Sequence, residues 1–423
     1  MDSLLIRNAR LDGQLVDILV EGGVYKEIGP DVGVSAERVL DAGGKPIVPP
    51  FYNMHTHAAM SLMRGYADDM ELFKWLNEYI WPAERDISPE DVYHGTRLAI
   101  LEMIRTGSIF FNDMYWYPDV ALQAVEEMGV RAALGRFIIE ESPGRIHRLN
   151  IEANNSLEKA YERSVVRDRV FLTWSPHAIY TVSEATLRRI GEQAMATGEH
   201  INIHASETIR EVEDALKKYG MSPIAWLDKC GVLGPKTVLA HCVHLSEADI
   251  KLIRERGATV VHMPVSNAKL GSGNFNYRKV VELGGCNFTI GTDGNASNNN
   301  LSMFDEVKAA ALVAKLTTGD PACGKDDALW KAATRGGAQA FGINGGIIAE
   351  GAVADALLID ASNVLMVPEH YLVANMVYSA DSSCVDTVIC GGRVLMEGRR
   401  IDGEADIIAG ARERAQRLDR IQL

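Results

Sequence analysis

The sequence has no pair of cysteines at the spacing that metal-binding or redox sites use. Its six cysteines are scattered over the second half of the chain, and none forms a CxxC pair or a dense framework. This argues against a disulfide scaffold and against the zinc deaminases that combine an HxE motif with PCxxC. We expect reduced thiols that fill the core of a cytoplasmic protein. The cysteines are Cys230, Cys242, Cys286, Cys323, Cys384 and Cys390.

The sequence also lacks an excess of positive charge and a long apolar run. Its 43 Lys and Arg are outnumbered by 57 Asp and Glu, which gives a formal net charge of -14 at pH 7. An acidic chain repels phosphate backbones, so we expect no nucleic-acid partner. No apolar stretch is long enough to cross a bilayer, and Arg7 and Arg10 interrupt the opening stretch MDSLLIRNARLDG. We expect a small-molecule substrate and no membrane partner, and we leave homo-oligomerisation open.

What the sequence does contain is a repeated unit, an apolar strand followed by an amphipathic helix, from about residue 46 to residue 340. In the helical stretch SPEDVYHGTRLAILEMIRTG, Ser88 can cap the helix, Asp91 completes a capping box and Gly107 ends the run. Eight strands that alternate with helices predict an α/β fold, the (β/α)8 or TIM barrel. The predicted strands are PIVPPFYNMH from Pro46, SIFFNDM from Ser108, RAALGRF from Arg131, VFLTWSPH from Val170, HINIHASE from His200, TVLAHCVH from Thr237, ATVVHMPVSN from Ala258 and CNFTIGTDG from Cys286.

The two ends of the chain have a different pattern from the barrel. Near the N-terminus, LVDILVEGG and VYKEIG alternate apolar and polar residues between Gly turns, and GAVADALLID and VDTVICGGRVLMEGR repeat this pattern near the C-terminus. Both ends together predict one small β-sandwich. We therefore expect residues 1–50 to form its first part, 51–345 the catalytic barrel, and 346–423 its second part with a C-terminal helix.

Titratable side chains gather at the C-terminal ends of the predicted strands, which form the face where barrel enzymes carry their chemistry. The first strand ends in the HxH pair His55 and His57, and alternation along a strand puts both imidazoles on the same side. Chance placement would scatter histidines along the strands, so this clustering at one rim indicates a site. The other members are His177, His204, Glu207, His241 and Asp293.

Four of these residues make a plausible ligand set for one metal ion. His55, His57, His204 and Asp293 offer three nitrogens and one oxygen, which suits zinc, iron or manganese. A further position stays open for a water, whose pKa the cation lowers so that hydroxide is available as a nucleophile. The sequence thus predicts a single hydrolytic metal centre.

The remaining titratable residues have predicted roles around this centre. Glu207, three residues beyond a ligand, is placed to move protons, and His241 to orient or polarise the nucleophile. We expect His244, which follows the strand end, at the surface or at a helix start. His177 stands where a two-metal site would need a carbamylated lysine, so we expect one metal ion. The other histidines are expected to pack or to lie at the surface; they include His94, His200, His262 and His370.

These stretches resemble the amidohydrolase superfamily, in its cytosine-deaminase-like branch of mononuclear aminohydrolases. The resemblance rests on HTHAAMSLMRG, HASET, AHCVHL, PVSNAKLGSG and GTDGNASNNNLSMFDE, which occur in the family's order and span nearly the whole predicted barrel. The segment IAEGAVADALLID also resembles the family's return to its β-sandwich. One departure is PP followed by Phe51 before the first strand, where the family usually has PG; the ligands are intact.

Within that branch the sequence is most similar to the 5-methylthioadenosine/S-adenosylhomocysteine deaminases. The resemblance implies the metal and proton-transfer roles given above. It also implies that Trp75 lies near the base, Glu84 binds the ribose hydroxyls and His177 lies at the adenine pocket. Two arginines are implied at the far end of the substrate: Arg136, and either Arg148 or Arg145.

The resemblance implies hydrolytic deamination of S-adenosylhomocysteine, 5'-methylthioadenosine, adenosine or 5'-deoxyadenosine. In this reaction an activated water attacks C6 of adenine, Glu207 protonates N1, His241 helps to hold the intermediate, and Asp293 passes a proton to the departing amino group. The alternative is another aminohydrolase or chlorohydrolase of triazines, pterins or guanine, which would share the metal residues. A non-catalytic binding protein is disfavoured, because it would have no reason to keep Glu207 together with His241.

Overall fold

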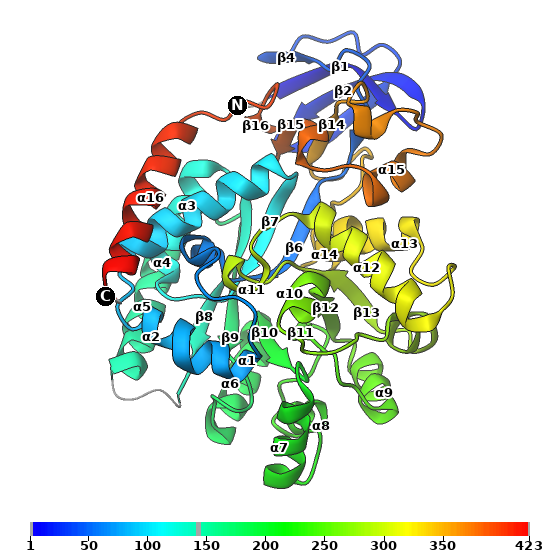
Figure 1. Ribbon diagram of the computed structural model, residues 1–423. Helices are drawn as coiled ribbons and strands as arrows, with labels where there is room; N and C mark the ends of the chain where they lie inside the picture. Colours follow the sequence, from blue (N-terminus) through cyan, green and yellow to red (C-terminus); the bar gives the residue numbers. More distant parts are fainter. Residues whose placement is uncertain (1–2, 141–144, 422–423) are drawn as a thin grey trace.

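Eight parallel strands form the barrel in the computed structural model, which describes residues 3–140 and 145–421 (Figure 1). The strands follow one another around the barrel in chain order. The last strand returns to the first, where the backbone N–H of Asp293 donates to the carbonyl of His55 at 3.0 Å. This confirms the predicted fold class. The strands are β6 (Phe51–Thr56), β7 (Ser108–Asp113), β8 (Arg131–Ile138), β9 (Val170–Pro176), β10 (His200–Ala205), β11 (Thr237–His241), β12 (Thr259–His262) and β13 (Asn287–Ile290).

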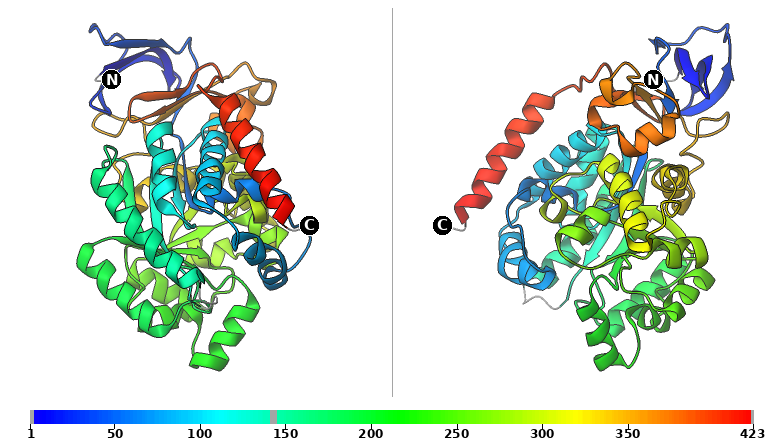
Figure 2. Two further views of the ribbon diagram at one scale, coloured as in Figure 1. Left: turned by 90° about the vertical axis from the view of Figure 1, so that its left-hand side faces the viewer. Right: turned by 45° about the vertical axis from the view of Figure 1, so that its right-hand side comes forward.

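Helices connect the strands and cover the outside of the barrel (Figures 1 and 2). As predicted, Ser88 caps the first long helix, and its hydroxyl and the Asp91 carboxylate form a capping box. These helices are α1 (Leu72–Trp75), α2 (Trp81–Glu84), α3 (Pro89–Arg105), α4 (Pro118–Met128), α5 (Arg145–Arg163), α6 (Glu184–Thr197), α7 (Ile209–Tyr219), α8 (Pro223–Lys229), α9 (Glu247–Arg256), α10 (Pro264–Lys269), α11 (Asn295–Asn298), α12 (Met303–Thr318), α13 (Asp326–Lys331) and α14 (Gly337–Ala340).

Two predicted strands differ from the structure because proline interrupts them. PIVPPFYNMH divides at Pro49 and Pro50 into β5 (Ile47–Val48) and β6. ATVVHMPVSN is a strand only as far as His262, and α10 begins at Pro264. Proline lacks a backbone N–H and fits the first turn of a helix, so each boundary follows from backbone chemistry.

The terminal segments form two further sheets within the described residues. One has the order β3-β2-β1-β4, and the other has the order β16-β15-β14-β5. Apolar side chains of both sheets share one core, with Ile6, Val20, Leu358 and Ile389 among its members. We propose that the chain divides near residues 50 and 345, as the sequence pattern suggests. The strands not yet given are β1 (Ser3–Leu11), β2 (Gln14–Glu21), β3 (Val24–Gly29), β4 (Arg38–Asp41), β14 (Ala356–Ile359), β15 (Val385–Cys390) and β16 (Arg393–Met396).

The terminal sheets pack against the N-terminal ends of the barrel strands. Arg131, at the start of β8, forms a buried ion pair with Asp355, which directly precedes β14. The face where the strands end therefore stays free of the terminal sheets.

The C-terminal helix α16 (Glu404–Ile421) leaves these sheets and lies along α3 of the barrel (Figure 2). In the chain, α15 (Leu372–Tyr378) falls between β14 and β15, and it packs against α12 and α13.

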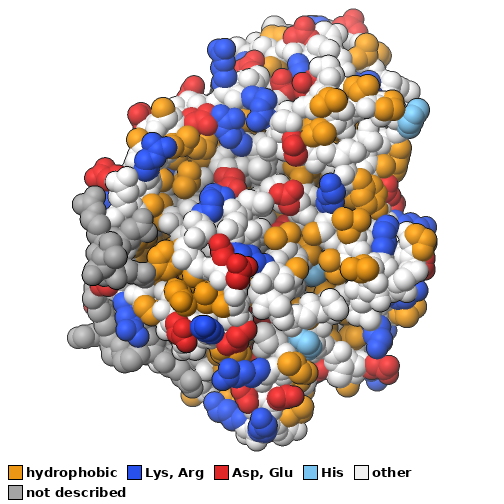
Figure 3. Space-filling model, in the orientation of Figure 1, with side chains coloured by type: hydrophobic (Ala, Val, Ile, Leu, Met, Phe, Trp, Pro, Cys, Tyr) orange, Lys and Arg blue, Asp and Glu red, His pale blue; other side chains and the backbone are white. Residues whose placement is uncertain are grey.

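The surface carries both charges. On the face drawn in Figure 3, basic and acidic side chains are interspersed. Among the described helices, none combines the length and apolar character that a membrane crossing requires.

Candidate metal and catalytic site

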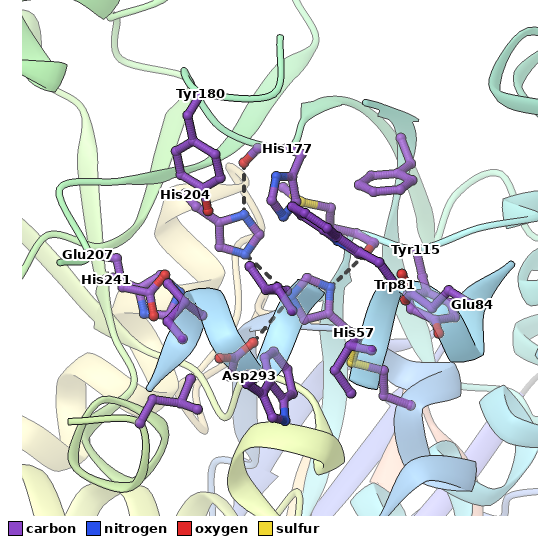
Figure 4. A pocket seen from close by; sticks show the side chains of 18 residues that line it. His57, Trp81, Glu84, Tyr115, His177, Tyr180, His204, Glu207, His241 and Asp293 are labelled. Atoms are coloured by element: carbon purple, nitrogen blue, oxygen red, sulfur yellow. Dashed lines mark hydrogen bonds and ion pairs between the residues drawn. The ribbon is translucent and has the colours of Figure 1, made fainter. Parts of the chain in front are cut away.

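A cavity lies at the C-terminal ends of the barrel strands, under the segment that contains α1 and α2 (Figure 4). Between α1 and α2 the chain makes a π-helical turn, Leu76–Ile80, and such turns are frequent at functional sites. The cavity holds only about 50 Å³, far less than the roughly 300 Å³ or more of typical ligand pockets. The cavity as it stands is therefore smaller than a nucleoside-sized ligand needs.

Three imidazoles and one carboxylate converge at the floor of this cavity. The Nε2 atom of His204 lies 3.1 Å from Nε2 of His55 and 3.3 Å from Nε2 of His57. The Nε2 atom of His57 is in turn 3.2 Å from Oδ1 of Asp293. These side chains come from the ends of β6, β10 and β13, so the barrel itself brings them together.

The outer nitrogen of each imidazole faces an oxygen. Nδ1 of His55 lies 3.3 Å from Oδ1 of Asn202, Nδ1 of His57 lies 2.6 Å from the carbonyl of Met114, and Nδ1 of His204 lies 2.8 Å from the carbonyl of His177. A carbonyl oxygen can only accept, so each Nδ1 carries a proton, and each Nε2 faces inward, where a cation would take its lone pair. Histidines that bind metals are held in this way.

The arrangement of the three inward nitrogens favours a bound cation. Three imidazole lone pairs that face each other at hydrogen-bonding distance repel, unless a positive charge lies between them. Three nitrogens with one carboxylate oxygen form a donor set that suits zinc, iron or manganese. The predicted ligands, His55, His57, His204 and Asp293, can therefore hold one divalent ion.

His241 also faces this centre. Its ligand atom and those of His55, His204 and Asp293 all lie within 4.8 Å of one another. The structure thus brings a fourth histidine to the place where the sequence predicts three.

The charges at the centre depend on one another. Burial raises the pKa of Asp293, but the hydrogen bond and charge of His57 outweigh it and hold the pKa well below its usual range. Burial lowers the pKa of His57, but Asp293 outweighs it and raises the pKa to about 9, so a cation that binds here displaces the Nε2 proton of this imidazole. Burial, together with the charge of His57, lowers the pKa of His55 to about 3. The carboxylate is thus ionised and ready to bind a cation.

Glu207 and His241 lie side by side on the wall of the cavity, 3.8 Å apart between Oε2 and Nε2. Burial raises the pKa of Glu207, although the charge of His241 opposes the shift. A carboxyl with a raised pKa is suited to giving and taking a proton near neutral pH.

Several residues near the metal ligands have strained backbones. Ser206, His241, Cys242 and Asp293 have positive φ angles of 52°, 73°, 50° and 63°. Side chains other than glycine rarely adopt these angles, and such strain concentrates at active sites. Gly291 has a different reason to be glycine, because a Cβ there would lie 2.7 Å from the backbone nitrogen of His55.

The structure brings three of the predicted substrate residues to the cavity. Trp75, Glu84 and His177 all line it. Burial raises the pKa of Glu84 to about 7, while Tyr115 and Trp116 oppose the shift. Burial, with the charges of nearby histidines, lowers the pKa of His177 to about 3, so this imidazole is neutral. Its Nδ1 lies 2.8 Å from the hydroxyl of Thr181.

Arg136 does not line the cavity, and its contact with the substrate stays a prediction. Phe137 lines the cavity, and because strand residues alternate, Arg136 next to it points to the outside of the barrel. Its guanidinium is paired with Glu158 at 3.0 Å and with both oxygens of Glu199, and it stacks over Trp174. The side chains of Arg145 and Arg148, the other predicted arginines, lie outside the described residues.

Some residues of the site were not identified from the sequence. Asn202 lies two positions before His204 on β10, and strand alternation could have found it. Other cavity residues come from apolar stretches with no distinguishing pattern; they are Met60, Leu72, Leu76, Ile80, Trp81, Met114, Tyr115, Phe137, Tyr180 and Leu270.

The chain matches known proteins over almost its entire length. Residues 47–395 match the model of the amidohydrolase family. A 5-methylthioadenosine/S-adenosylhomocysteine deaminase of Archaeoglobus fulgidus is 41% identical, covering 98% of this chain and 99% of the relative. A 5'-deoxyadenosine deaminase of Methanospirillum hungatei is 44% identical, covering 94% and 89%. The crystal structure of an adenosine deaminase from Xanthomonas campestris with bound zinc superposes with a TM-score of 0.92 at 33% identity, covering 99% of each chain. The chain therefore belongs to the amidohydrolase family.

Proposed function

We propose that this protein is a hydrolase that deaminates adenine nucleosides, giving the inosyl product and ammonia at one divalent cation. The observation that carries the proposal is the convergence of three inward imidazole nitrogens and one carboxylate oxygen, with Glu207 and His241 beside them. The names of the similar proteins support an adenine nucleoside as the substrate.

His55, His57, His204 and Asp293 would hold the cation, and zinc is the first choice because a related adenosine deaminase was crystallised with it. When bound, a divalent cation lowers the pKa of water and so provides a nucleophile near neutral pH. Iron and manganese accept the same donors.

The protein's own side chains would move the protons. Glu207, with its raised pKa, gives a proton to N1 of the purine as C6 becomes tetrahedral. His241 stabilises the charge that develops beside it. Asp293 takes one proton of the attacking water and passes it to the amino group, which leaves as ammonia when the C6–N bond breaks. The second proton of the water returns to Glu207 as the C6 carbonyl forms. The inosyl product remains in the cavity.

Trp75, Glu84 and His177 would bind the nucleoside. An indole offers a flat surface for the base, and a carboxylate accepts hydrogen bonds from two ribose hydroxyls. The neutral His177 would contact the adenine ring. We also place the protein in the cytoplasm, which its six unpaired, buried cysteines support.

The test is ammonia release by purified protein of known zinc content. The substrates are S-adenosylhomocysteine, 5'-methylthioadenosine, adenosine and 5'-deoxyadenosine, with guanine, a pterin and a triazine as controls. We expect the adenosines to react and the controls not to react. Reaction of guanine, the pterin or the triazine alone would overturn the nucleoside assignment and favour the alternative hydrolase.

A further inference from the structure

One short segment contacts the three side chains that handle protons. Residues 264–272 comprise α10 and the turn that follows it, and they contribute Ser266, Asn267 and Ser272. We propose that this segment positions the proton-transfer residues, and that Asn267 fixes which ring nitrogen of His241 carries its proton. Only the expected effect on turnover rests on the proposed function.

The contact of Asn267 with His241 determines how the imidazole can act. Oδ1 of Asn267 lies 2.8 Å from Nδ1 of His241, and both side chains are buried. An amide oxygen only accepts, so Nδ1 of His241 carries a proton and donates it, and Nε2 is left facing the cavity. The other tautomer would place two acceptors against each other.

A second histidine fixes the orientation of the Asn267 amide. Nδ2 of Asn267 lies 3.4 Å from Nδ1 of His262. Burial lowers the pKa of His262 to about 3, so this ring is neutral and its Nδ1 can accept. The amide nitrogen is thereby assigned to His262, and the amide oxygen is left for His241.

Ser266 fixes the direction of Asp293. Its hydroxyl donates to Oδ2 of Asp293 at 2.6 Å. The Oδ1 atom of the same carboxylate lies 3.2 Å from Nε2 of His57. The hydroxyl of Ser297 on α11 donates to the same Oδ2 at 2.9 Å, so this oxygen is held from two sides and Oδ1 stays directed at the imidazoles.

Ser272 is the third side chain of this segment, and it contacts Glu207. Its hydroxyl donates to Oε1 of Glu207 at 3.1 Å, while Oε2 faces His241. The turn that carries Ser272 is itself held, because Nε2 of His244 donates to the carbonyl of Ser272. His244 is half-buried and lies two residues before Ser246, which caps α9, in agreement with the helix start expected from the sequence.

The first test uses the Asn267→Leu variant. Histidine labelled with ¹⁵N reports the tautomer of His241 in metal-free protein, with the signal assigned by a His241→Gln variant. We expect the Nδ1–H form in the wild type and a growing Nε2–H form in Asn267→Leu. In the zinc-loaded enzyme, kcat should fall about 10- to 100-fold with little change in KM, as for outer residues at metal sites.

Two further variants separate positioning from folding. Asn267→Asp keeps an acceptor for His241 and should recover most of the Nδ1–H form and of kcat. Thr237→Val is the matched control, because it removes a buried side-chain hydrogen bond at the other end of the strand that carries His241. It should leave both the tautomer and kcat unchanged.

Ser266→Ala is the independent variant if Asn267→Leu does not fold. It should weaken zinc binding about 10- to 100-fold in competition with a chelator, since Oδ2 of Asp293 then keeps only the hydrogen bond from Ser297. The inference is overturned if His241 keeps its Nδ1–H form in Asn267→Leu, or if zinc affinity in Ser266→Ala equals that of the wild type. The tautomer of His241 and the zinc affinity are measured without turnover. They therefore test the inference even if no adenosine releases ammonia.

Discussion

Glu207 combines full burial with two polar neighbours, the hydroxyl of Ser272 and the imidazole of His241. Replacing it with glutamine keeps the size and hydrogen bonding of the side chain but removes its exchangeable proton. We expect Glu207→Gln to bind zinc as the wild type does and to lose about 10²- to 10⁴-fold in kcat, the usual contribution of a general acid. Zinc content and steady-state rates measure both quantities, and full activity would show that another group supplies the proton.

Glu84 should give the enzyme a pH dependence near neutrality. Its pKa is raised to about 7, so the side chain is neutral below that pH and ionised above it. An ionised carboxylate accepts hydrogen bonds more strongly than a neutral carboxyl. We expect kcat/KM for adenosine to rise as the pH increases through about 7, because this ratio reports the free enzyme.

The Glu84→Gln variant isolates this effect. Its kcat/KM should be lower above neutrality and should lack the rise that Glu84 causes, since glutamine does not titrate. The other groups at the site titrate in both proteins, so the difference between the two profiles belongs to Glu84. Identical profiles would mean that Glu84 does not contact the substrate.

At the scale of elements, the sequence predicted which segments form strands and helices. It did not predict the residue at which each element ends, or which of its side chains point into the barrel. The apolar strands and the capping box at Ser88 follow from local pattern. The outward position of Arg136 could not be predicted, because a motif does not tell which face of a strand a residue occupies until the strand's register is known. The contacts of Asn267 could not be predicted, because they depend on how α10 packs against the ends of β11 and β12.

The position of the C-terminal helix α16 also depends on a contact between distant parts of the chain. Nε of Arg417 on α16 donates to Oδ1 of Asp91 at 3.1 Å, and Asp91 belongs to the buried capping box of α3. Loss of a hydrogen bond to a charged group costs about 1–3 kcal/mol. We expect Arg417→Ala to lower the free energy of unfolding by this amount in urea titrations.

The control is Arg412→Ala, which changes an exposed arginine on the same helix. It should stay within about 0.5 kcal/mol of the wild type, as exposed substitutions do. Equal stability of the two variants would show that α16 is not held through Asp91.

At the scale of the whole molecule, a buried ion pair joins the barrel to the terminal sheets. Asp355 accepts from Nε of Arg131 at 3.0 Å, from the hydroxyl of Tyr52 at 3.0 Å and from the N–H of Gly391. This junction lies at the strand ends opposite the cavity. One end of the barrel therefore carries contacts that stabilise the fold, and the other end carries the candidate catalytic residues.

Breaking this pair should destabilise the protein strongly. Asp355→Leu leaves Arg131 buried without its partner, which costs about 3–5 kcal/mol. The double variant Arg131→Met with Asp355→Leu removes both charges and should be clearly more stable than Asp355→Leu alone. Chemical denaturation of the wild type, both single variants and the double variant measures the coupling, and additive losses would contradict it.

The central claim is that one cation, held by His55, His57, His204 and Asp293, makes this barrel a nucleoside deaminase. The most direct measurement is ammonia release from 5'-deoxyadenosine by metal-free protein as zinc is added in known amounts. The account predicts no turnover without zinc, a linear rise, and saturation at one zinc ion per chain. Turnover that is independent of added zinc, or that saturates only at two ions per chain, would contradict it.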